Sequence, residues 1–379
     1  MRIIFLSTSV GALGSGIGGG VELTLRTLAR ALAQRGHDVT VVAPRGSVMT
    51  AQGSSAALVA TTAVAADGQK RESGRLRLIE VDGELHVPSQ TLDRAAVPVV
   101  PKNSVLVNMW NEAMRLVASE GYDIVLNFAY DAHPFLHAKG CPVPVAHLVS
   151  MGSLNDEMDR AVLAAVRAAG QSVAMHSRAQ ADTFVDEIST AATIVASGVD
   201  LGTYRFVATP TDDLAVVARI SGEKGIVDAF EVSALSGRRL RVFGVMEDEE
   251  VWREAAARHP QARVEHVGFL STEDLQAQLG HSAALIMVHH WVEAFGNVAI
   301  EALACGVPVI TYDRGGPAEI VRDGVTGYVV PVDQPVEVAR AVAKVASIDR
   351  RRCRAEVEER FSATAFAERV ETWLRRQFS

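Results

Sequence analysis

Short apolar runs alternate with helical patterns along most of this 379-residue chain. An apolar run at residues 3–5 is followed by glycine-rich sequence, a helical pattern of leucines over 23–32 and a second apolar run at 39–42. Strand, glycine turn, helix and strand in this order predict a βαβ unit with parallel strands. Further short strands are expected at 76–81, 124–126, 143–146, 172–175 and 193–195.

The same alternation restarts after an irregular stretch at 198–213. Strands are expected at 214–218, 241–243, 264–267, 284–288, 307–311 and 327–330, with a helix at 226–235 and an amphipathic helix at 363–378. The pattern predicts two Rossmann-like, doubly wound α/β domains with parallel sheets that face a central cleft. We place them at 1–205 and 206–361, and expect the last segment, 362–379, to pack back toward the first domain.

The stretch 47–104 lacks this regular pattern. It is rich in Ala, Ser, Thr and Gly. Two interpretations stay open: a variable surface excursion, or a mobile flap over an acceptor site, since long loops on rigid scaffolds carry specificity.

Composition narrows the class of protein. Hydrophobic residues make up 48% and charged residues 22%, which is typical of a globular chain. The net charge of −8 argues against nucleic-acid binding and strong membrane association. Three scattered cysteines form neither a disulfide framework nor a zinc site, and no apolar stretch is long enough for a membrane span or a signal peptide. We expect a soluble, cytoplasmic protein.

Two glutamates mark the most informative segment of the second domain. Residues 293–301 read EAFGNVAIE, and Gly296 and Asn297 suit the start of a helix. Glu293 then lies on the preceding loop and Glu301 within the helix, near backbone amides that favour a phosphate or a sugar oxygen. Carboxylates accept hydrogen bonds from hydroxyls, so a sugar or ribose is a natural partner, although two isolated glutamates are more often simply solvated.

Two cations occur at the end of the first strand of this domain. Residues 217–225 read VARISGEKG, with Arg219 and Lys224 across a strand-to-loop turn. Cations in this arrangement can converge on a pyrophosphate and neutralise its charge.

These segments together resemble one enzyme family. The E-x7-E element, the VARISGEKG segment, VGFL at 267–270, GGPAEI at 315–320 and DGVTG at 323–327 occur in the order found in the retaining family-4 glycosyltransferases, which have the GT-B fold. The resemblance covers nearly the whole second domain. It implies a retaining hexosyltransferase that uses a nucleotide sugar as co-substrate, with no other cofactor. It also implies no metal, because two side-chain cations would neutralise the diphosphate.

The resemblance also implies roles for individual residues. Glu301 is expected to hydrogen-bond the ribose, and Glu293 to hold hydroxyls of the transferred sugar. Arg219 and Lys224 are expected to stabilise the departing diphosphate. Further donor contacts are expected from Gly268, Phe269, Leu270, Phe295, Gly296, Asn297 and Val298. His289, His290 and Trp291 directly precede Glu293 and either contact a substrate or simply pack.

A glycine-rich segment follows the first strand of the chain. Residues 11–22 read GALGSGIGGGVE, and glycines let a backbone approach a ligand closely. We nominate Gly18, Gly19 and Gly20 as donor contacts and Glu22 as an acceptor contact. The segment also fits the G-x-G-x-x-G pattern of dinucleotide-binding proteins, so an NADP-dependent oxidoreductase is an alternative, although the second strand ends at Arg45 and not at an acidic residue.

The first domain departs from the family at one position. Members commonly carry a histidine where this chain has Phe128. Nearby Asp131 and His133 are candidates for orienting or deprotonating an acceptor hydroxyl, and Phe128 and Tyr130 for an aromatic wall. The opening segment and the stretch NFAYD at 127–131 resemble bacterial enzymes that glucosylate pterins such as tetrahydrobiopterin.

The sequence therefore predicts transfer of a hexose to a small hydroxylated acceptor. UDP-glucose is the favoured donor, with GDP-mannose or UDP-N-acetylglucosamine as further candidates, and a pterin is one candidate acceptor. A non-catalytic nucleotide-sugar-binding protein and a nucleotide-sugar epimerase of the same fold remain alternatives. The oligomeric state is not predicted.

Overall fold

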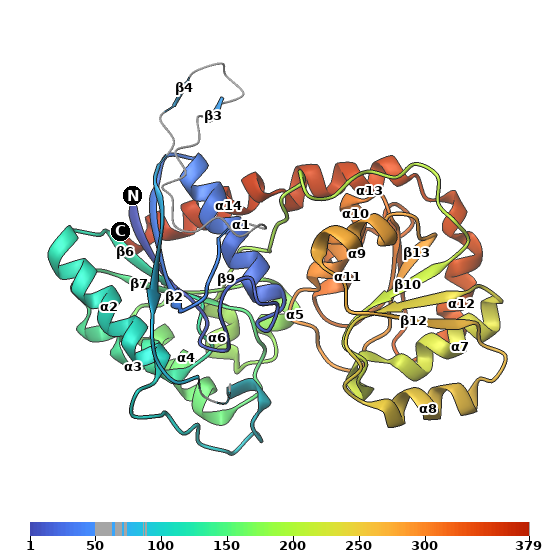
Figure 1. Ribbon diagram of the computed structural model, residues 1–379, viewed down its shortest axis with the longest axis horizontal. Helices are drawn as coiled ribbons and strands as arrows, with labels where there is room; N and C mark the ends of the chain where they lie inside the picture. The colour runs from blue at the N-terminus through green and yellow to red at the C-terminus, as the bar shows by residue number, and fades with distance from the viewer. Residues whose placement is uncertain (50–62, 65–69, 72–73, 86, 88, 379) are drawn as a thin grey trace. The chain divides into compact units, whose positions relative to one another are not determined.

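The computed structural model describes residues 1–49, 63–64, 70–71, 74–85, 87 and 89–378. The chain forms two compact units (Figure 1). Unit 1 comprises residues 1–197 together with 366–379, and unit 2 comprises residues 198–365. The two units meet at 197/198, and the residues from Phe366 onward belong to unit 1.

The core of unit 1 is a parallel sheet in the order β5-β2-β1-β6-β7-β8-β9. The strand β1 lies in the middle of the sheet, between β2 and β6. Its side chains are apolar and buried on both faces, as is typical of a central parallel strand with helices on each side. The strands are β1 (Arg2–Leu6), β2 (Asp38–Pro44), β5 (Leu76–Val81), β6 (Ile124–Asn127), β7 (Val145–Val149), β8 (Val173–Met175) and β9 (Thr193–Ile194). A separate antiparallel pair joins β3 (Ala63–Val64) and β4 (Lys70–Arg71).

Helices cover both faces of this sheet. On one face, α2 packs on Ile4 and Leu6, and the series continues through the packed helices α3, α4 and α6. The bounds are α2 (Val105–Glu120), α3 (Ala132–His137), α4 (Asp156–Ala168), α5 (Arg178–Ala181) and α6 (Asp186–Ala191). Two further helices are α1 (Gly20–Gln34) and α14 (Ala363–Arg375). Arg35, just after α1, forms an ion pair with Glu371 of α14. Trp373 of α14 donates a hydrogen bond from Nε1 to the carbonyl of Gln171.

Unit 2 contains a second parallel sheet, in the order β12-β11-β10-β13-β14-β15. Its strands are β10 (Leu214–Val217), β11 (Leu240–Phe243), β12 (Val264–Gly268), β13 (Ala284–Met287), β14 (Val309–Tyr312) and β15 (Gly327–Val330). One group of packed helices comprises α7 (Ile226–Ser236), α8 (Glu249–Arg258) and α12 (Pro335–Lys344). The other comprises α9 (Thr272–Leu279), α10 (Asn297–Ala304), α11 (Gly316–Ile320) and α13 (Arg350–Glu356).

Both sheets reverse their strand order once. In unit 1 the reversal lies between β1 and β6, and in unit 2 it lies between β10 and β13. Ligands of doubly wound folds bind outside the carboxyl ends of the strands at such a switch point. The predicted fold class is confirmed, and the topology directs attention to the loops that follow these four strands.

Most predicted strands lie where the sequence placed them, within one or two residues. The strand expected at 143–146 begins at Val145, because Pro144 precedes it and a proline has no amide to donate to the sheet. Of the irregular stretch 47–104, residues 50–62, 65–69, 72–73, 86 and 88 lie outside the described residues, so the choice between excursion and flap stays open. Within the part of the chain that is described, no helix is both long and apolar enough to cross a membrane.

Candidate functional site

Two loops meet at the switch point of unit 2. One comprises residues 218–225 after β10, and the other comprises residues 288–296 after β13. A Cβ added to Gly225 would lie 1.8 Å from the carbonyl oxygen of Val288, and Gly225 has a φ of +71°, so only glycine permits this approach. The backbone amide of His290 donates to the carbonyl of Glu223 at 2.9 Å. The two loops are therefore fixed to each other through the backbone.

Lys224 and Glu293 extend from these two loops and form an ion pair. The Lys224 Nζ lies 3.0 Å from Glu293 Oε2. The same Nζ lies 4.4 Å from the ring centroid of Trp291. Both charged side chains are largely buried, so bulk water screens their charges only partly. The structure thus brings together two residues that are far apart in the sequence and that we predicted to contact the donor.

A third loop, after β14, fixes the backbone of Glu293. The amide of Gly316 donates to the carbonyl of Glu293 at 2.8 Å. A Cβ added to Gly315 would lie 2.7 Å from Glu293 backbone atoms, and one added to Gly316 would lie 2.5 Å from Phe295. The GGPAEI segment therefore supplies close backbone packing, which accounts for the adjacent glycines.

Glu301 is the other glutamate of the E-x7-E element. It lies in the second turn of α10 and is 7% exposed. Its carboxyl makes no hydrogen bond or ion pair to any described residue, and burial raises its pKa to about 7. A buried carboxyl without a partner is costly unless a ligand supplies hydroxyl or amide donors.

Arg219 is placed at the same edge but is engaged differently from Lys224. Its guanidinium pairs with Glu247 at 2.6 Å and lies 3.5 Å from Glu223. Glu247 was not among the predicted residues. It follows β11, the strand beside β10. In this structure both predicted cations therefore have carboxylate partners.

The other predicted donor residues lie around the same edge of unit 2. Gly268 ends β12 with a φ of +93°, and Phe269 beside it is 67% exposed. Gly296 precedes α10 in a left-handed conformation, and Phe295 is buried against Phe361. Leu270, Asn297 and Val298 complete the strand-end and helix-start segments. Their contacts with a donor remain predictions.

A polar cluster lies beside the meeting loops. His290 Nε2 is 3.0 Å from Asp228 Oδ2, and the Tyr312 hydroxyl donates to the same carboxylate at 2.6 Å. Ligand atoms of His290, Asp228 and Asp333 lie within 4.8 Å of one another. Arg314 binds both carboxylate oxygens of Asp333, at 3.0 and 2.7 Å. The cluster ties the start of α7 to the loop after β13.

In unit 1, the glycine-rich loop is organised by Glu22. The carboxylate of Glu22 accepts hydrogen bonds from the amides of Gly14, Gly16 and Gly18, at 2.7, 3.3 and 2.6 Å. Glu22 is 4% exposed. The loop that we predicted to bind a ligand with its amides therefore binds its own carboxylate at these positions. Donor contacts of Gly18, Gly19 and Gly20, and an acceptor contact of Glu22, remain predictions.

We expect Glu22→Ala to loosen this loop. The substitution removes the acceptor of three partly exposed loop amides, and a hydrogen bond of this kind contributes about 0.5–1.5 kcal/mol to stability. Urea denaturation should show lower stability, and limited proteolysis should cut within 11–20 sooner. Glu22→Gln, which keeps one acceptor oxygen, is the control. Its stability and its rate of cleavage should lie between those of the wild type and those of Glu22→Ala. Equal stability and equal cleavage of all three proteins would contradict this role of Glu22.

The aromatic residues predicted to bind the acceptor have partners inside unit 1. Phe128 is 2% exposed and packs on Phe5, with ring centroids 5.1 Å apart. The hydroxyl of Tyr130 donates to the carbonyl of Gly152 at 2.8 Å. The ring that replaces the family histidine is thus a core side chain in this structure.

The polar acceptor candidates also make local contacts. Asp131 is 3% exposed and caps α3 by accepting from the amide of His133 at 3.0 Å. The His133 ring lies 4.1 Å from that of His137, and burial lowers its pKa. Catalytic roles for Asp131 and His133 stay predictions.

Comparisons with known proteins identify both parts of the chain. Residues 207–368 match the family described as Glycosyl transferases group 1, and residues 18–202 match Glycosyltransferase Family 4. The fold is similar to that of HepE from Anabaena, which was solved in complex with UDP, with a TM-score of 0.69. The two sequences are 17% identical, and the match covers 99% of this chain and 100% of HepE. The chain belongs to the group 1 and family 4 superfamily of GT-B glycosyltransferases.

Curated relatives of this chain match only in part. Glycogen synthase of Mycobacterium tuberculosis is 32% identical over 168 residues, which cover 41% of this chain and 39% of that protein. D-inositol 3-phosphate glycosyltransferase of Mycobacterium sp. (strain JLS) is 31% identical over 220 residues, covering 50% of this chain and 45% of that protein. The chain thus spans less than half the length of these two relatives.

The comparisons support the predicted superfamily but not the finer resemblance to pterin glucosyltransferases. They also favour the glycosyltransferase prediction over the oxidoreductase alternative. The hydrogen bonds of Glu22 agree with this, because the amides of Gly14, Gly16 and Gly18 are already occupied where a dinucleotide pyrophosphate would bind.

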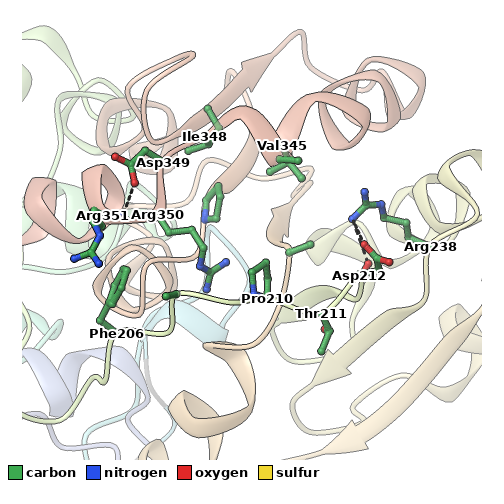
Figure 2. A pocket seen from close by; sticks show the side chains of 14 residues that line it. Phe206, Pro210, Thr211, Asp212, Arg238, Val345, Ile348, Asp349, Arg350 and Arg351 are labelled. Atoms are coloured by element: carbon green, nitrogen blue, oxygen red, sulfur yellow. Dashed lines mark hydrogen bonds and ion pairs between the residues drawn. The ribbon is translucent and has the colours of Figure 1, made fainter.

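A cavity of about 380 Å³ lies elsewhere in unit 2 (Figure 2). Asp212, Ala283 and Pro308 line it and lie just before β10, β13 and β14, so it opens at the amino ends of the strands. The buried guanidinium of Arg350 donates to three backbone carbonyls there. None of the predicted donor residues lines this cavity.

Proposed function

We propose that this chain is a retaining glycosyltransferase that transfers glucose from UDP-glucose to a small hydroxylated acceptor. Superfamily membership supports a nucleotide-sugar donor, and the fold is similar to that of a protein solved with UDP. The retaining outcome, the donor and the acceptor are our inferences, drawn from the motifs and from the residues at the switch point of unit 2.

The observation that carries the proposal is the buried carboxyl of Glu301 on α10, the helix that directly follows the loop of the Lys224–Glu293 pair. Ribose hydroxyls would donate to Glu301, which makes no hydrogen bond to a described residue. The ammonium of Lys224 and the guanidinium of Arg219 would bind the diphosphate, and Glu293 would accept from hydroxyls of the sugar. These residues would thus supply partners for the ribose, the diphosphate and the transferred sugar.

The proposed reaction places the acceptor on the same face of the sugar as the leaving diphosphate. The bond between the anomeric carbon and the phosphate oxygen breaks, and a bond from that carbon to the acceptor oxygen forms. The acceptor proton passes to the departing phosphate oxygen. Arg219 and Lys224 stabilise the negative charge that develops on the diphosphate, which is where fixed cations lower the barrier most. No metal is required in this scheme, so activity should survive EDTA.

Calorimetric titration with UDP, GDP, ADP and NADPH tests the donor. UDP is expected to bind and NADPH is not. Release of UDP from UDP-glucose, with product mass spectrometry over a panel of polyols, sugars, sugar phosphates and pterins, then tests transfer and the acceptor. Binding of NADPH without UDP would overturn the proposal, and binding of GDP in place of UDP would change the donor to a GDP-sugar.

The buried ring of Phe128 favours a second candidate function. If the histidine that family members carry at this position is needed for transfer, the chain binds a nucleotide sugar without transferring it. Such a protein would bind UDP-glucose but release no UDP with any acceptor or in water. Introducing the histidine with Phe128→His and measuring UDP release separates the two functions.

A further inference from the structure

Trp291 is the third side chain at the meeting point of the two unit 2 loops. It lies between His290, whose amide binds the loop of Lys224, and Val292. Its indole face lies 4.4 Å from the Lys224 Nζ, and its Nε1 is buried with no hydrogen-bond partner in the described residues. Among the described residues, the charged group in contact with the indole is thus the ammonium of Lys224.

An ammonium at the end of a flexible chain needs more than one contact to stay in place. Lys224 has four rotatable side-chain bonds, and fixing such a side chain costs about 1.5–2 kcal/mol of rotamer freedom. Glu293 binds the Nζ at 3.0 Å, and the indole provides a second, uncharged contact. Together they restrict where the positive charge lies.

The two contacts differ in what happens when a donor binds. Under the proposed function, the carboxylate of Glu293 turns to hydroxyls of the sugar and loses part of its hold on Lys224. The indole carries no net charge, so it holds the ammonium without neutralising the charge that attracts a diphosphate. Trp291 can therefore keep Lys224 in place during donor binding, whereas Glu293 competes with the diphosphate.

We propose that Trp291 is a positioning residue that holds the Lys224 ammonium toward the donor diphosphate. The proposal rests on the proposed function for the identity of the ligand. It predicts that Trp291 contributes to the binding of a nucleoside diphosphate and contributes little to the binding of the nucleoside alone.

The test compares UDP and uridine in calorimetric titrations of the full chain. Trp291→Leu is expected to weaken UDP binding about tenfold, within the range of a buried cation–π contact, and to change uridine binding less than about twofold. Trp291→Phe keeps an aromatic face and is expected to retain most of the affinity. Val292→Ala, the next position on the loop and 41% exposed, is the matched control and should bind UDP as the wild type does.

A double-mutant cycle separates positioning from a general effect on the fold. In a Lys224→Met background, Trp291→Leu is expected to weaken UDP binding no further, because the partner of the indole is already absent. Equal UDP affinity of wild type and Trp291→Leu would overturn the inference and leave the proposed function standing. An equal loss of uridine and UDP binding, or an undiminished loss in the Lys224→Met background, would also overturn it. Failure of the wild type to bind UDP or any other nucleoside diphosphate would instead refute the proposed function.

Discussion

Glu301→Gln will remove a pH dependence from the stability of the ligand-free protein. Burial raises the pKa of Glu301 from 4.5 to about 7, so between these values the unfolded chain loses this proton and the folded chain keeps it. The unfolded state then binds fewer protons, and the free energy of unfolding falls as the pH rises from 4.5 to 7. The fall is of the order of 3 kcal/mol and persists above pH 7. Urea denaturation at pH 5 and pH 8 measures it.

The same substitution is expected to weaken UDP binding about 10- to 100-fold at pH 8, because hydrogen bonds from ribose hydroxyls to a charged acceptor are replaced by weaker ones. In the wild type, affinity for UDP should rise between pH 6 and pH 8 as the carboxyl ionises, and in Glu301→Gln it should not. Glu358→Gln, at an exposed glutamate of unit 2, is the control for both measurements. The free energy of unfolding should fall more between pH 5 and pH 8 in the wild type than in Glu301→Gln. An equal fall in both proteins would contradict a protonated Glu301 in the folded state.

Replacing Arg219 and Lys224 is expected to have the largest effect on turnover. Arg219→Ala or Lys224→Met should each lower kcat about 100- to 1,000-fold, because each removes a cation from the place where negative charge develops, and removing one such group typically costs about 2.7–4 kcal/mol. The measurement is the initial rate of UDP release at saturating UDP-glucose with whichever acceptor is turned over, or with water.

The two cations have matched controls at the surface of unit 2. Arg239→Ala removes an arginine that pairs with Asp213 just before β10, at the opposite edge of the sheet, and Lys344→Met removes a lysine at the end of α12. Both controls should keep the wild-type rate. Full activity of the Arg219→Ala, Lys224→Met double variant would refute these roles and the metal-independent scheme with them.

The sequence was sufficient for the fold because its signals are local. Short apolar runs mark the buried strands, and parallel strands bring their carboxyl ends to one edge whatever the loops between them contain. Lys224 and Glu293 could therefore be expected at the same edge, and their ion pair agrees with this. The fold class followed for the same reason.

Contacts that depend on loop conformation could not be predicted. Glu22 has the sequence position of an acceptor-binding residue, yet the loop folds back so that its carboxylate accepts from three amides. Phe128 was nominated for an acceptor wall because an aromatic ring suits a flat acceptor, and the sequence did not predict that this ring packs on Phe5. The partnership of Arg219 with Glu247 depends on how two neighbouring strand ends turn, which no local pattern specifies.

The close packing of the three loops in unit 2 has a consequence for engineering. Gly225, Gly315 and Gly316 each lie so near the backbone of another loop that no side chain fits, so the backbones act as one interlocked piece. An inserted residue in any of them would displace the other two. Attempts to change the donor sugar by grafting sequence from another glycosyltransferase should therefore transplant the three loops as a set, or exchange side chains alone and leave the loop lengths untouched.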